Sequence, residues 1–274
     1  MLVLLPPSEG KATGGSGSPL DLGSLSLPGL GAARAEVLDQ LVSLCSGDEV
    51  KAAEVLGLSE GLRGEIAKNA ALREAGTRPA GEIYTGVLYD ALGLATLPPA
   101  ARRRAERSLL VFSGLWGAVR IDDRIPSYRC SMGVKLPGPG ALGSYWRTRT
   151  PMADVLPEAA GNGLVLDLRS AAYAAAWKPK GAVAERTATV RVVQSKIVNG
   201  VEKRSVVSHF NKATKGRMVR DLLTAGADPS GPGELVEALR GLGYVVEAAP
   251  PERAGRAWAL DVVVTEAQLR GMWW

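Results

Sequence analysis

The sequence has few of the side chains that hold metals or disulfides. Its 274 residues include two cysteines, Cys45 and Cys130, and a single histidine, His209. Two isolated cysteines cannot form a disulfide framework, which favours a reducing, cytoplasmic location. One histidine argues against a His-rich zinc or iron site. We therefore predict no metal site and no resident cofactor.

The sequence also lacks segments that direct a chain to membranes. No apolar run approaches the roughly 18 residues that a transmembrane helix needs. The first residues read Met-Leu-Val-Leu-Leu-Pro-Pro, without a basic lead or a cleavage site, so we expect no signal peptide and no membrane partner. Hydrophobic residues make up 46% and charged residues 22%, which excludes intrinsic disorder because the chain has enough apolar surface to fold.

Helical and strand patterns alternate along the chain without an internal repeat or an evident linker. We expect strands at 2–5, 109–112, 128–134, 164–168, 187–198, 201–210, 245–247 and 257–265. We expect helices at 31–45, 48–57, 59–75, 84–93, 99–107, 143–156 (interrupted near Pro151), 171–177, 211–225 and 234–241. Asn199-Gly200 predicts a tight hairpin turn, because both residues tolerate positive φ. These elements predict one α/β (mixed α+β) domain over residues 1–274.

Positive charge is concentrated in two central segments. Residues 99–149 carry a net charge of +7 and residues 169–220 carry +10, whereas the remainder carries −12. Such segregation predicts a basic face for an anionic partner, such as DNA or a nucleotide-like small molecule. The alternative is that ordinary solvated faces are rich in arginine.

A phosphate site is indicated where the predicted hairpin gives way to a basic helix. Asn211 is a good N-cap, which would place Lys212 and Lys215 in the first helical turn. Lysines there oppose the helix dipole, and a bound anion would reverse that cost. The alternative is a helix that tolerates misplaced lysines. Lys11, which follows the first strand, is a second cation that could meet a phosphate. Its loop is not a Walker A motif, and the alternative, favoured when the segment is taken alone, is an ordinary loop at the end of a strand.

Other short segments carry polar groups for which structural roles are equally open. Gly114 and Gly117 lie three residues apart in a turn that resembles a helix-hairpin-helix element or a plain strand-to-helix turn. Asp122 and Asp123 can share a proton, hold a cation or pair with neighbouring arginines. Ser170, between a predicted strand and a predicted helix, is best explained as an N-cap.

Several blocks, taken in order, resemble the YaaA family of bacterial proteins associated with the peroxide stress response. The blocks are Leu4 to Lys11, Tyr84-Thr85-Gly86, Ser113 to Gly117, Tyr128-Arg129, Met132-Gly133, Asp167 to Ser170 with Tyr173, and Lys212 to Gly216. The resemblance implies a mixed sheet with flanking helices and a helix-hairpin-helix-like element at about 107–129. It also implies DNA binding through a positively charged cleft. Ser131 and Ala172 stand where some relatives have a carboxylate, so a mechanism that needs those acids would not operate here.

Carried onto this sequence, the resemblance assigns the DNA-binding element to Gly114 and Gly117. The cleft cations would be Arg120, Arg129, Lys212, Lys215 and Arg217. Trp116, Tyr128 or Trp146 would stack on unpaired bases if the DNA is distorted.

Two functions follow. The first is a DNA-binding protein of the peroxide response that binds duplex or distorted DNA and limits iron-driven oxidative damage. The alternative is an enzyme that acts on a nucleotide-like or phosphorylated small molecule. Its pocket would be built from Lys11, Asp123, Arg129, Ser170, Lys212 and Lys215. Asp123, Ser170 and Lys212 are the candidate catalytic residues.

Overall fold

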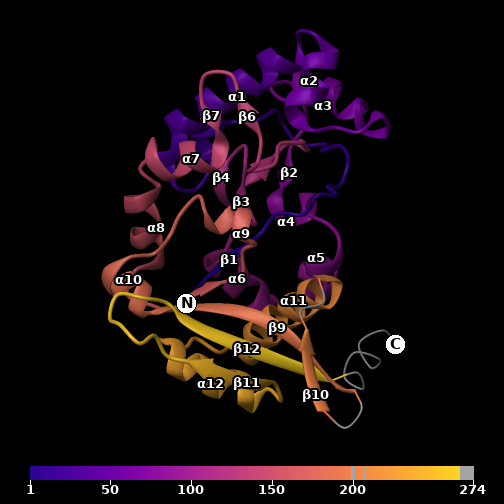
Figure 1. Ribbon diagram of the computed structural model, residues 1–274. Coiled ribbons are helices and arrows are strands. Elements are labelled where there is room, and N and C mark those ends of the chain that lie inside the picture. Colours follow the sequence, from indigo (N-terminus) through magenta and orange to yellow (C-terminus); the bar gives the residue numbers. More distant parts are fainter. Residues whose placement is uncertain (199–200, 206–207, 266–274) are drawn as a thin grey trace.

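The centre of the molecule is an eight-stranded mixed sheet (Figure 1). The computed structural model describes residues 1–198, 201–205 and 208–265. Strand order is β11-β12-β9-β8-β1-β3-β4, with β10 paired to β9. The strands are β1 (Leu2–Leu5), β3 (Leu109–Ser113), β4 (Gly117–Arg120), β8 (Val165–Asp167), β9 (Thr187–Val198), β10 (Val201–Ser205), β11 (Val245–Ala249) and β12 (Trp258–Thr265). Two small ribbons add β2 (Arg78–Pro79) with β5 (Arg124–Ile125), and β6 (Lys135–Leu136) with β7 (Gly140–Ala141).

The middle of the sheet is parallel and its edges are antiparallel. Strand β1 lies between β3 and β8, with Leu4 opposite Leu110 on one side and Asp167 on the other. Strands β8, β9 and β12 continue the parallel order, whereas β4, β10 and β11 run antiparallel to their partners. All four residues of β1 are buried, as a central parallel strand covered on both faces requires. The predicted α/β class is thereby confirmed.

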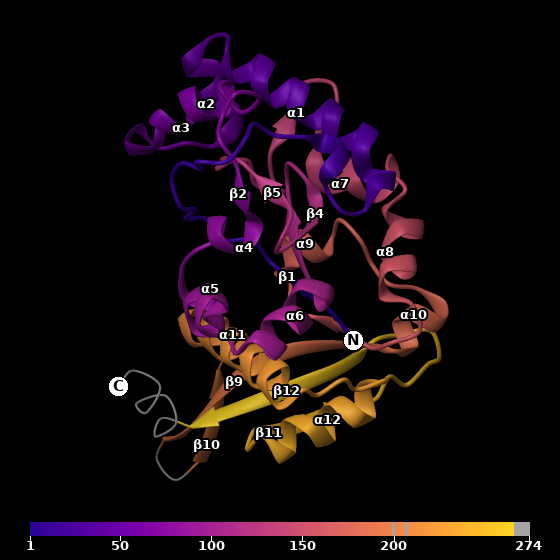
Figure 2. The ribbon, with the colours of Figure 1, turned by 180° about the vertical axis from the view of Figure 1, so that it is seen from behind.

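The helices cover both faces and the two ends of the sheet (Figures 1 and 2). They are α1 (Gly31–Cys45), α2 (Glu49–Leu56), α3 (Gly64–Ala70), α4 (Ala80–Ile83), α5 (Val87–Leu92), α6 (Pro99–Ser108), α7 (Leu142–Thr148), α8 (Met152–Ala160), α9 (Ala171–Ala174), α10 (Gly181–Glu185), α11 (Ser208–Ala225) and α12 (Pro232–Gly241). Helices α1 to α3 gather at one end of the molecule, and α11 and α12 pack at the other end against β9 and β11. Their apolar faces share one hydrophobic core with the sheet.

A charged residue is part of this core. Arg34 on α1 is fully buried, and its guanidinium donates to the carbonyl oxygens of Trp116 at 3.1 Å and Ala118 at 2.7 Å. Burial lowers its pKa to about 10. The side chain therefore fastens α1 to the turn between β3 and β4, supplying donors that an apolar residue lacks.

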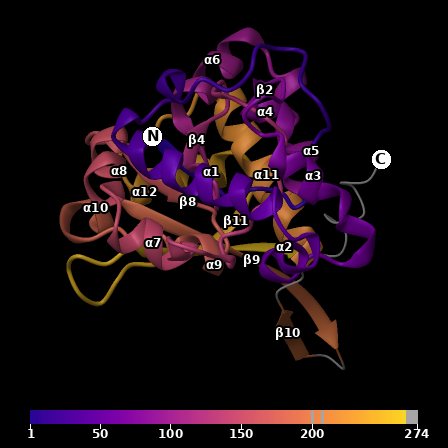
Figure 3. The same ribbon diagram turned by 90° about the horizontal axis from the view of Figure 1, so that it is seen from above.

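Among the sequence-based predictions that differ from the structure, two bear on the candidate site. The predicted strand at 128–134 was wrong: the segment is irregular, and the Asn69 amide occupies the backbone N–H and C=O of Arg129 at 2.9 and 2.8 Å. The predicted strand at 201–210 ends at Ser205, and α11 begins at Ser208, so Asn211 lies inside the helix rather than at its cap. The prediction that Lys212 and Lys215 lie in the first turn was therefore wrong, because both follow that turn. The hairpin strands pair as predicted and project from the body (Figure 3), whereas Asn199-Gly200 falls outside the described residues.

The helix-hairpin-helix prediction is not confirmed. Residues 113–117 join two strands, with Ser113 paired to Gly117 across the β3–β4 hairpin. A Cβ on Gly114 would lie 2.7 Å from the Cys130 carbonyl oxygen, so this turn is packed against the 130–131 backbone. The apolar residues that follow Gly117 complete a buried edge strand instead of a helix. Both glycines are buried and serve close packing.

Candidate functional site

A cavity of about 800 Å³ opens at the carboxyl ends of β1 and β8. Ligand sites of open α/β sheets commonly form at this edge. The lining residues come from six short segments: 6–11, 56–57, 85–89, 129–131, 168–173 and 211–215. The cavity therefore joins loops that lie more than two hundred residues apart in the chain.

Five of the six residues proposed for a small-molecule pocket line this cavity. They are Lys11, Arg129, Ser170, Lys212 and Lys215. The remaining predicted site residues do not line it: Gly114, Gly117, Arg120, Tyr128, Asp123 and Arg217. Among the described residues that line the cavity, Glu9 is the one carboxylate, so the wall is predominantly basic.

The loop after β1 is fixed by the segment that leads into α5. The Tyr89 hydroxyl donates to the Pro6 carbonyl oxygen at 2.7 Å, and the Thr85 N–H donates to Ser8 Oγ at 3.1 Å. Lys11 forms a β-bridge with Tyr84. These bonds hold the loop against the rest of the fold although it contains two prolines and a glycine.

Lys11 is the most buried cation of the cavity wall. Its Nζ donates to the Ser8 carbonyl oxygen at 2.9 Å and lies 4.6 Å from the Tyr128 ring centroid and 5.7 Å from that of Tyr84. Burial and, to a smaller extent, the neighbouring charge of Arg129 lower the pKa of Lys11 to about 8. Lys11 is therefore an amine that can lose its proton near neutral pH.

A chain of hydroxyl groups forms the floor beneath Lys11. The Tyr84 and Tyr128 hydroxyls lie 2.9 Å apart, and Tyr128 lies 2.6 Å from Ser113 Oγ. The backbone N–H groups of Leu115 and Trp116 donate to Ser113 Oγ, so its own proton is left to donate to Tyr128. Burial raises the pKa of both phenols, which keeps them neutral.

Arg129 is held from behind by the buried Asn69 described above. Its guanidinium reaches the opposite loop, where Nη1 donates to the Glu9 carbonyl oxygen at 3.1 Å. The backbone position is therefore fixed while the side chain stays partly exposed at the cavity wall.

Helix α11 supplies two lysines of different character. Lys212 is exposed, whereas Lys215 is partly buried and donates from Nζ to the Leu168 carbonyl oxygen at 3.3 Å. Burial lowers the pKa of Lys215, and the nearby charge of Asp167 opposes that shift. A Cβ on Gly216 would lie 2.1 Å from the Leu88 carbonyl oxygen, so glycine is what allows α11 to pack this closely on α5.

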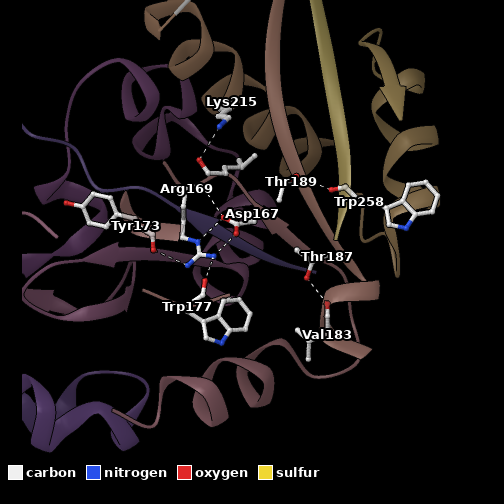
Figure 4. Close-up of polar contacts among 10 residues, drawn as sticks. Asp167, Arg169, Tyr173, Trp177, Val183, Thr187, Thr189, Lys215 and Trp258 are labelled. Carbon is white, nitrogen blue, oxygen red and sulfur yellow. Dashed lines mark hydrogen bonds and ion pairs between the residues drawn. The ribbon is translucent and has the colours of Figure 1, made fainter. Parts of the chain in front are cut away.

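A buried ion pair shapes the loop after β8 (Figure 4). Arg169 binds the carboxylate of Asp167 through Nε and Nη2, and its guanidinium lies 4.2 Å from the Phe112 ring centroid. The same guanidinium donates to the carbonyl oxygens of Tyr173 and Trp177. Ser170 occupies the N-cap position of α9, as expected, but its exposed side chain makes no capping bond. The ion pair thus fixes the loop that presents Ser170 and Tyr173 to the cavity.

Asp123 has a structural position away from the cavity. Its Oδ1 accepts from the Ser26 N–H at 2.8 Å and from Ser26 Oγ at 2.6 Å. Its Oδ2 accepts from the Arg120 N–H at 2.9 Å. Asp123 therefore closes a turn and ties it to the 22–30 segment, which removes it from the candidate catalytic residues.

The aromatic residues expected to stack on bases are also inaccessible. Trp116 and Trp146 are 0% exposed and Tyr128 is 1% exposed. Trp146 donates from Nε1 to the Gly114 carbonyl oxygen at 2.8 Å, which fixes it inside the core.

Several cavity residues carry no signal that sequence reasoning used. Val87 and Tyr89 on α5 line the cavity, although the sequence pointed only to the neighbouring Tyr84-Thr85-Gly86 block. Leu56 and Gly57 form another part of the wall at the end of α2.

A membrane-spanning helix is absent from the described residues, because none of their helices has the length and apolar character needed.

Comparison with known proteins agrees with the motif pattern. A UPF0246 protein of Streptomyces coelicolor is 74% identical over 266 residues, covering 97% of this chain and 99% of its own. A UPF0246 protein of Corynebacterium efficiens is 44% identical over 266 residues, covering 96% and 100%. An uncharacterized protein of Campylobacter jejuni is 30% identical over 220 residues, covering 79% and 82%. The model of the family described as peroxide stress protein YaaA matches residues 1–249, and the chain therefore belongs to that family.

Proposed function

We propose that the cavity binds a phosphorylated, nucleotide-like small molecule. The observation that carries the proposal is the convergence of Lys11, Arg129, Lys212 and Lys215 on one cavity from three separate parts of the chain. Clustered cations repel one another, and a bound phosphate would offset that repulsion with charge-assisted hydrogen bonds.

The shape and the remaining wall support a small ligand. Small-molecule sites typically enclose about 300–1,000 Å³, and this cavity of about 800 Å³ falls in that range. Val87 and Tyr173, which are partly exposed and line the cavity, provide apolar surface for a base or a comparable flat group. Asn211 Oδ1 is buried without a partner among the described residues, so an acceptor is left for a ligand donor.

An enzyme built on this cavity would draw on Lys11, Ser170 and Lys212. Ser170 presents a free hydroxyl and Lys11 a desolvated amine, whereas Lys212 and Lys215 would neutralise the ligand's charge. Since Asp123 lies elsewhere, an acid–base role would fall to the lysine amines.

DNA binding in the peroxide response, with protection against iron-driven damage, is the second candidate. Lys212 and Arg217 are both exposed on α11, where a nucleic-acid backbone would contact them. One observation argues against a broad basic face. Many arginines of the two basic segments donate to backbone carbonyl oxygens of the protein rather than being free to contact DNA. Examples are Arg104 to Leu223 at 2.8 Å and Arg220 to Gly93 at 2.8 Å.

Fluorescence anisotropy across a salt series separates the two candidates. Nucleoside mono- and diphosphates would compete with a labelled nucleotide, while duplex, bulged and single-stranded oligonucleotides would bind weakly and without structural preference. Tight binding of bulged or duplex DNA that falls steeply with salt, and that free nucleotides do not displace, would favour the DNA-binding function instead.

A further inference from the structure

Lys11 is a cavity lysine without an anionic partner. In the described part of the chain its Nζ has one hydrogen bond, to the Ser8 carbonyl oxygen, and no ion pair. The amine lies over the Tyr128 and Tyr84 rings, 4.6 and 5.7 Å from their centroids, and Lys11 lines the cavity. Lysines kept only for charge normally stay hydrated or paired, so this placement favours the neutral amine.

The charges around Lys11 act in the same direction as its burial. Arg129, from the opposite wall, disfavours the ammonium form, and together with burial it lowers the pKa of Lys11 to about 8. Glu9, Glu65 and Cys130 oppose the shift without cancelling it, and the neutral phenols of the floor add no charge. A desolvated lysine beside another cation is the arrangement that activates amines toward carbonyl compounds.

The other two cavity lysines, Lys212 and Lys215, have surroundings that favour their protonated state more than those of Lys11 do. Lys212 is exposed, so water stabilises its ammonium form. Burial lowers the pKa of Lys215 as well, but the nearby charge of Asp167 favours its protonated state. These two lysines and Arg129 are therefore suited to bind an anionic group, which leaves Lys11 as the amine for chemistry.

We propose that Lys11 forms a reversible imine with the carbonyl carbon of a phosphorylated aldehyde or ketone whose phosphate is bound by Arg129, Lys212 and Lys215. This inference rests on the proposed function and narrows its ligand to phosphorylated carbonyl compounds. The Nζ lone pair forms a bond to the carbonyl carbon. The carbonyl oxygen then leaves as water with the two protons that the amine loses, and the C=N bond remains. No oxidant or reductant is consumed.

Pyridoxal 5′-phosphate is a suitable probe, because it combines an aldehyde with a phosphate. The protein is incubated with substoichiometric probe at pH 8 and reduced with borohydride, which adds hydride to the imine carbon and fixes the label as a secondary amine. Peptide mass spectrometry then locates the label. Pyridoxal, which lacks the phosphate, is the matched control, and the exposed Lys51 serves as the internal reference.

The expected result is labelling at Lys11 at least tenfold above Lys51, a loss of that preference with pyridoxal, and no label at residue 11 in Lys11→Arg. Label on Lys212 or spread evenly over surface lysines would overturn the inference. Because the site is mapped in the unaltered protein, the result does not depend on the variant folding. Nucleotide binding measured in parallel by thermal shift separates the two proposals: binding without Lys11 labelling defeats only the imine, and the absence of both defeats the pocket function as well.

Discussion

The Arg169 guanidinium donates two parallel hydrogen bonds to the Asp167 carboxylate, from Nε to Oδ1 at 2.8 Å and from Nη2 to Oδ2 at 2.5 Å. Both side chains are almost completely buried, at 0% and 7% exposure. Asp167 is the last residue of β8, and the ion pair fixes the backbone on both sides of Leu168. The Leu168 carbonyl oxygen accepts the hydrogen bond from Lys215. It therefore links the stability of the sheet to the geometry of the cavity.

Removing the carboxylate charge should destabilise the protein strongly. Asp167→Asn leaves the Arg169 charge buried without its counter-ion, and we expect the free energy of unfolding to fall by about 3–5 kcal/mol. Asp261→Asn is the control, because its partner Arg191 is 64% exposed, and it should cost less than about 1 kcal/mol. Urea unfolding curves of both variants test this, and equal losses would contradict the structural role of the buried pair.

Anion binding should depend on the two lysines of α11 that line the cavity. The double variant Lys212→Ala/Lys215→Ala should abolish measurable nucleotide binding, because it removes half of the converging cations. Arg217→Ala, on the same helix but outside the cavity, should leave affinity unchanged within about twofold. Isothermal titration calorimetry gives both affinities. Unchanged nucleotide affinity in the double variant would refute the phosphate site proposed at these lysines.

The period-two pattern illustrates what the sequence predicts and what it misses. Tyr128, Cys130, Met132 and Val134 alternate with polar residues, and all four are buried as in a strand. Within the described residues no strand pairs with them, and the Asn69 amide supplies hydrogen bonds to this segment instead. Alternation reports which side chains face the core, whereas a strand also needs a ladder partner that only the tertiary fold provides.

The candidate site shows the same division. Lys11, Ser170 and Lys215 were predictable because each lies close to the end of a strand or on a basic helix, where α/β folds place ligand sites. From the sequence alone Asp123 was also a candidate catalytic residue. In the structure its carboxylate oxygens accept hydrogen bonds from Ser26 and Arg120. The sequence indicates which groups can react, but the side of the sheet on which each loop emerges decides which groups meet.

The pH dependence of ligand binding should report on Lys11. As pH rises from 7 to 9 its amine loses a proton, because its pKa is about 8, and the cavity loses one positive charge. A nucleoside monophosphate stays doubly ionised over this range, since its second pKa is about 6. Affinity should therefore fall several-fold between pH 7 and pH 9, and Lys11→Arg, which stays charged, should show a flatter profile. Parallel profiles for the two proteins would exclude Lys11 as the titrating group.

The protein's own stability should respond to pH in the opposite sense. The folded-state pKa of Lys11 is lowered from 10.5 to about 8, so between these values the unfolded chain binds more protons than the folded one. Stability therefore gains from Lys11 deprotonation as pH rises through about 8, and the gain is complete near 10.5. The difference between unaltered protein and Lys11→Met, measured by urea unfolding from pH 7 to 10, isolates this contribution. A difference that does not change with pH would contradict the lowered pKa.

Close packing of α11 on α5 should make Gly216 intolerant of a side chain. Gly216→Ala places a methyl group 2.1 Å from the Leu88 carbonyl oxygen, and we expect a loss of about 1–3 kcal/mol in unfolding free energy as the helices separate. Gly233→Ala on α12 is the control, since nothing lies within 4 Å of its Cβ, and alanine there should stabilise the helix by up to about 1 kcal/mol. Thermal unfolding of the two variants shows whether each substitution raises or lowers stability. Stabilisation by Gly216→Ala would contradict the close approach of α11 to α5.

The central claim, that one cavity gathers its cations around a phosphorylated ligand, is tested most directly by a crystal structure of the protein with a nucleoside monophosphate. We expect the phosphate in the cavity at the ends of β1 and β8, within hydrogen-bond distance of Arg129 and Lys215. A phosphate bound outside it, for example on the exposed face of α11 at Arg217, would contradict the claim, as would an empty cavity at saturating nucleotide.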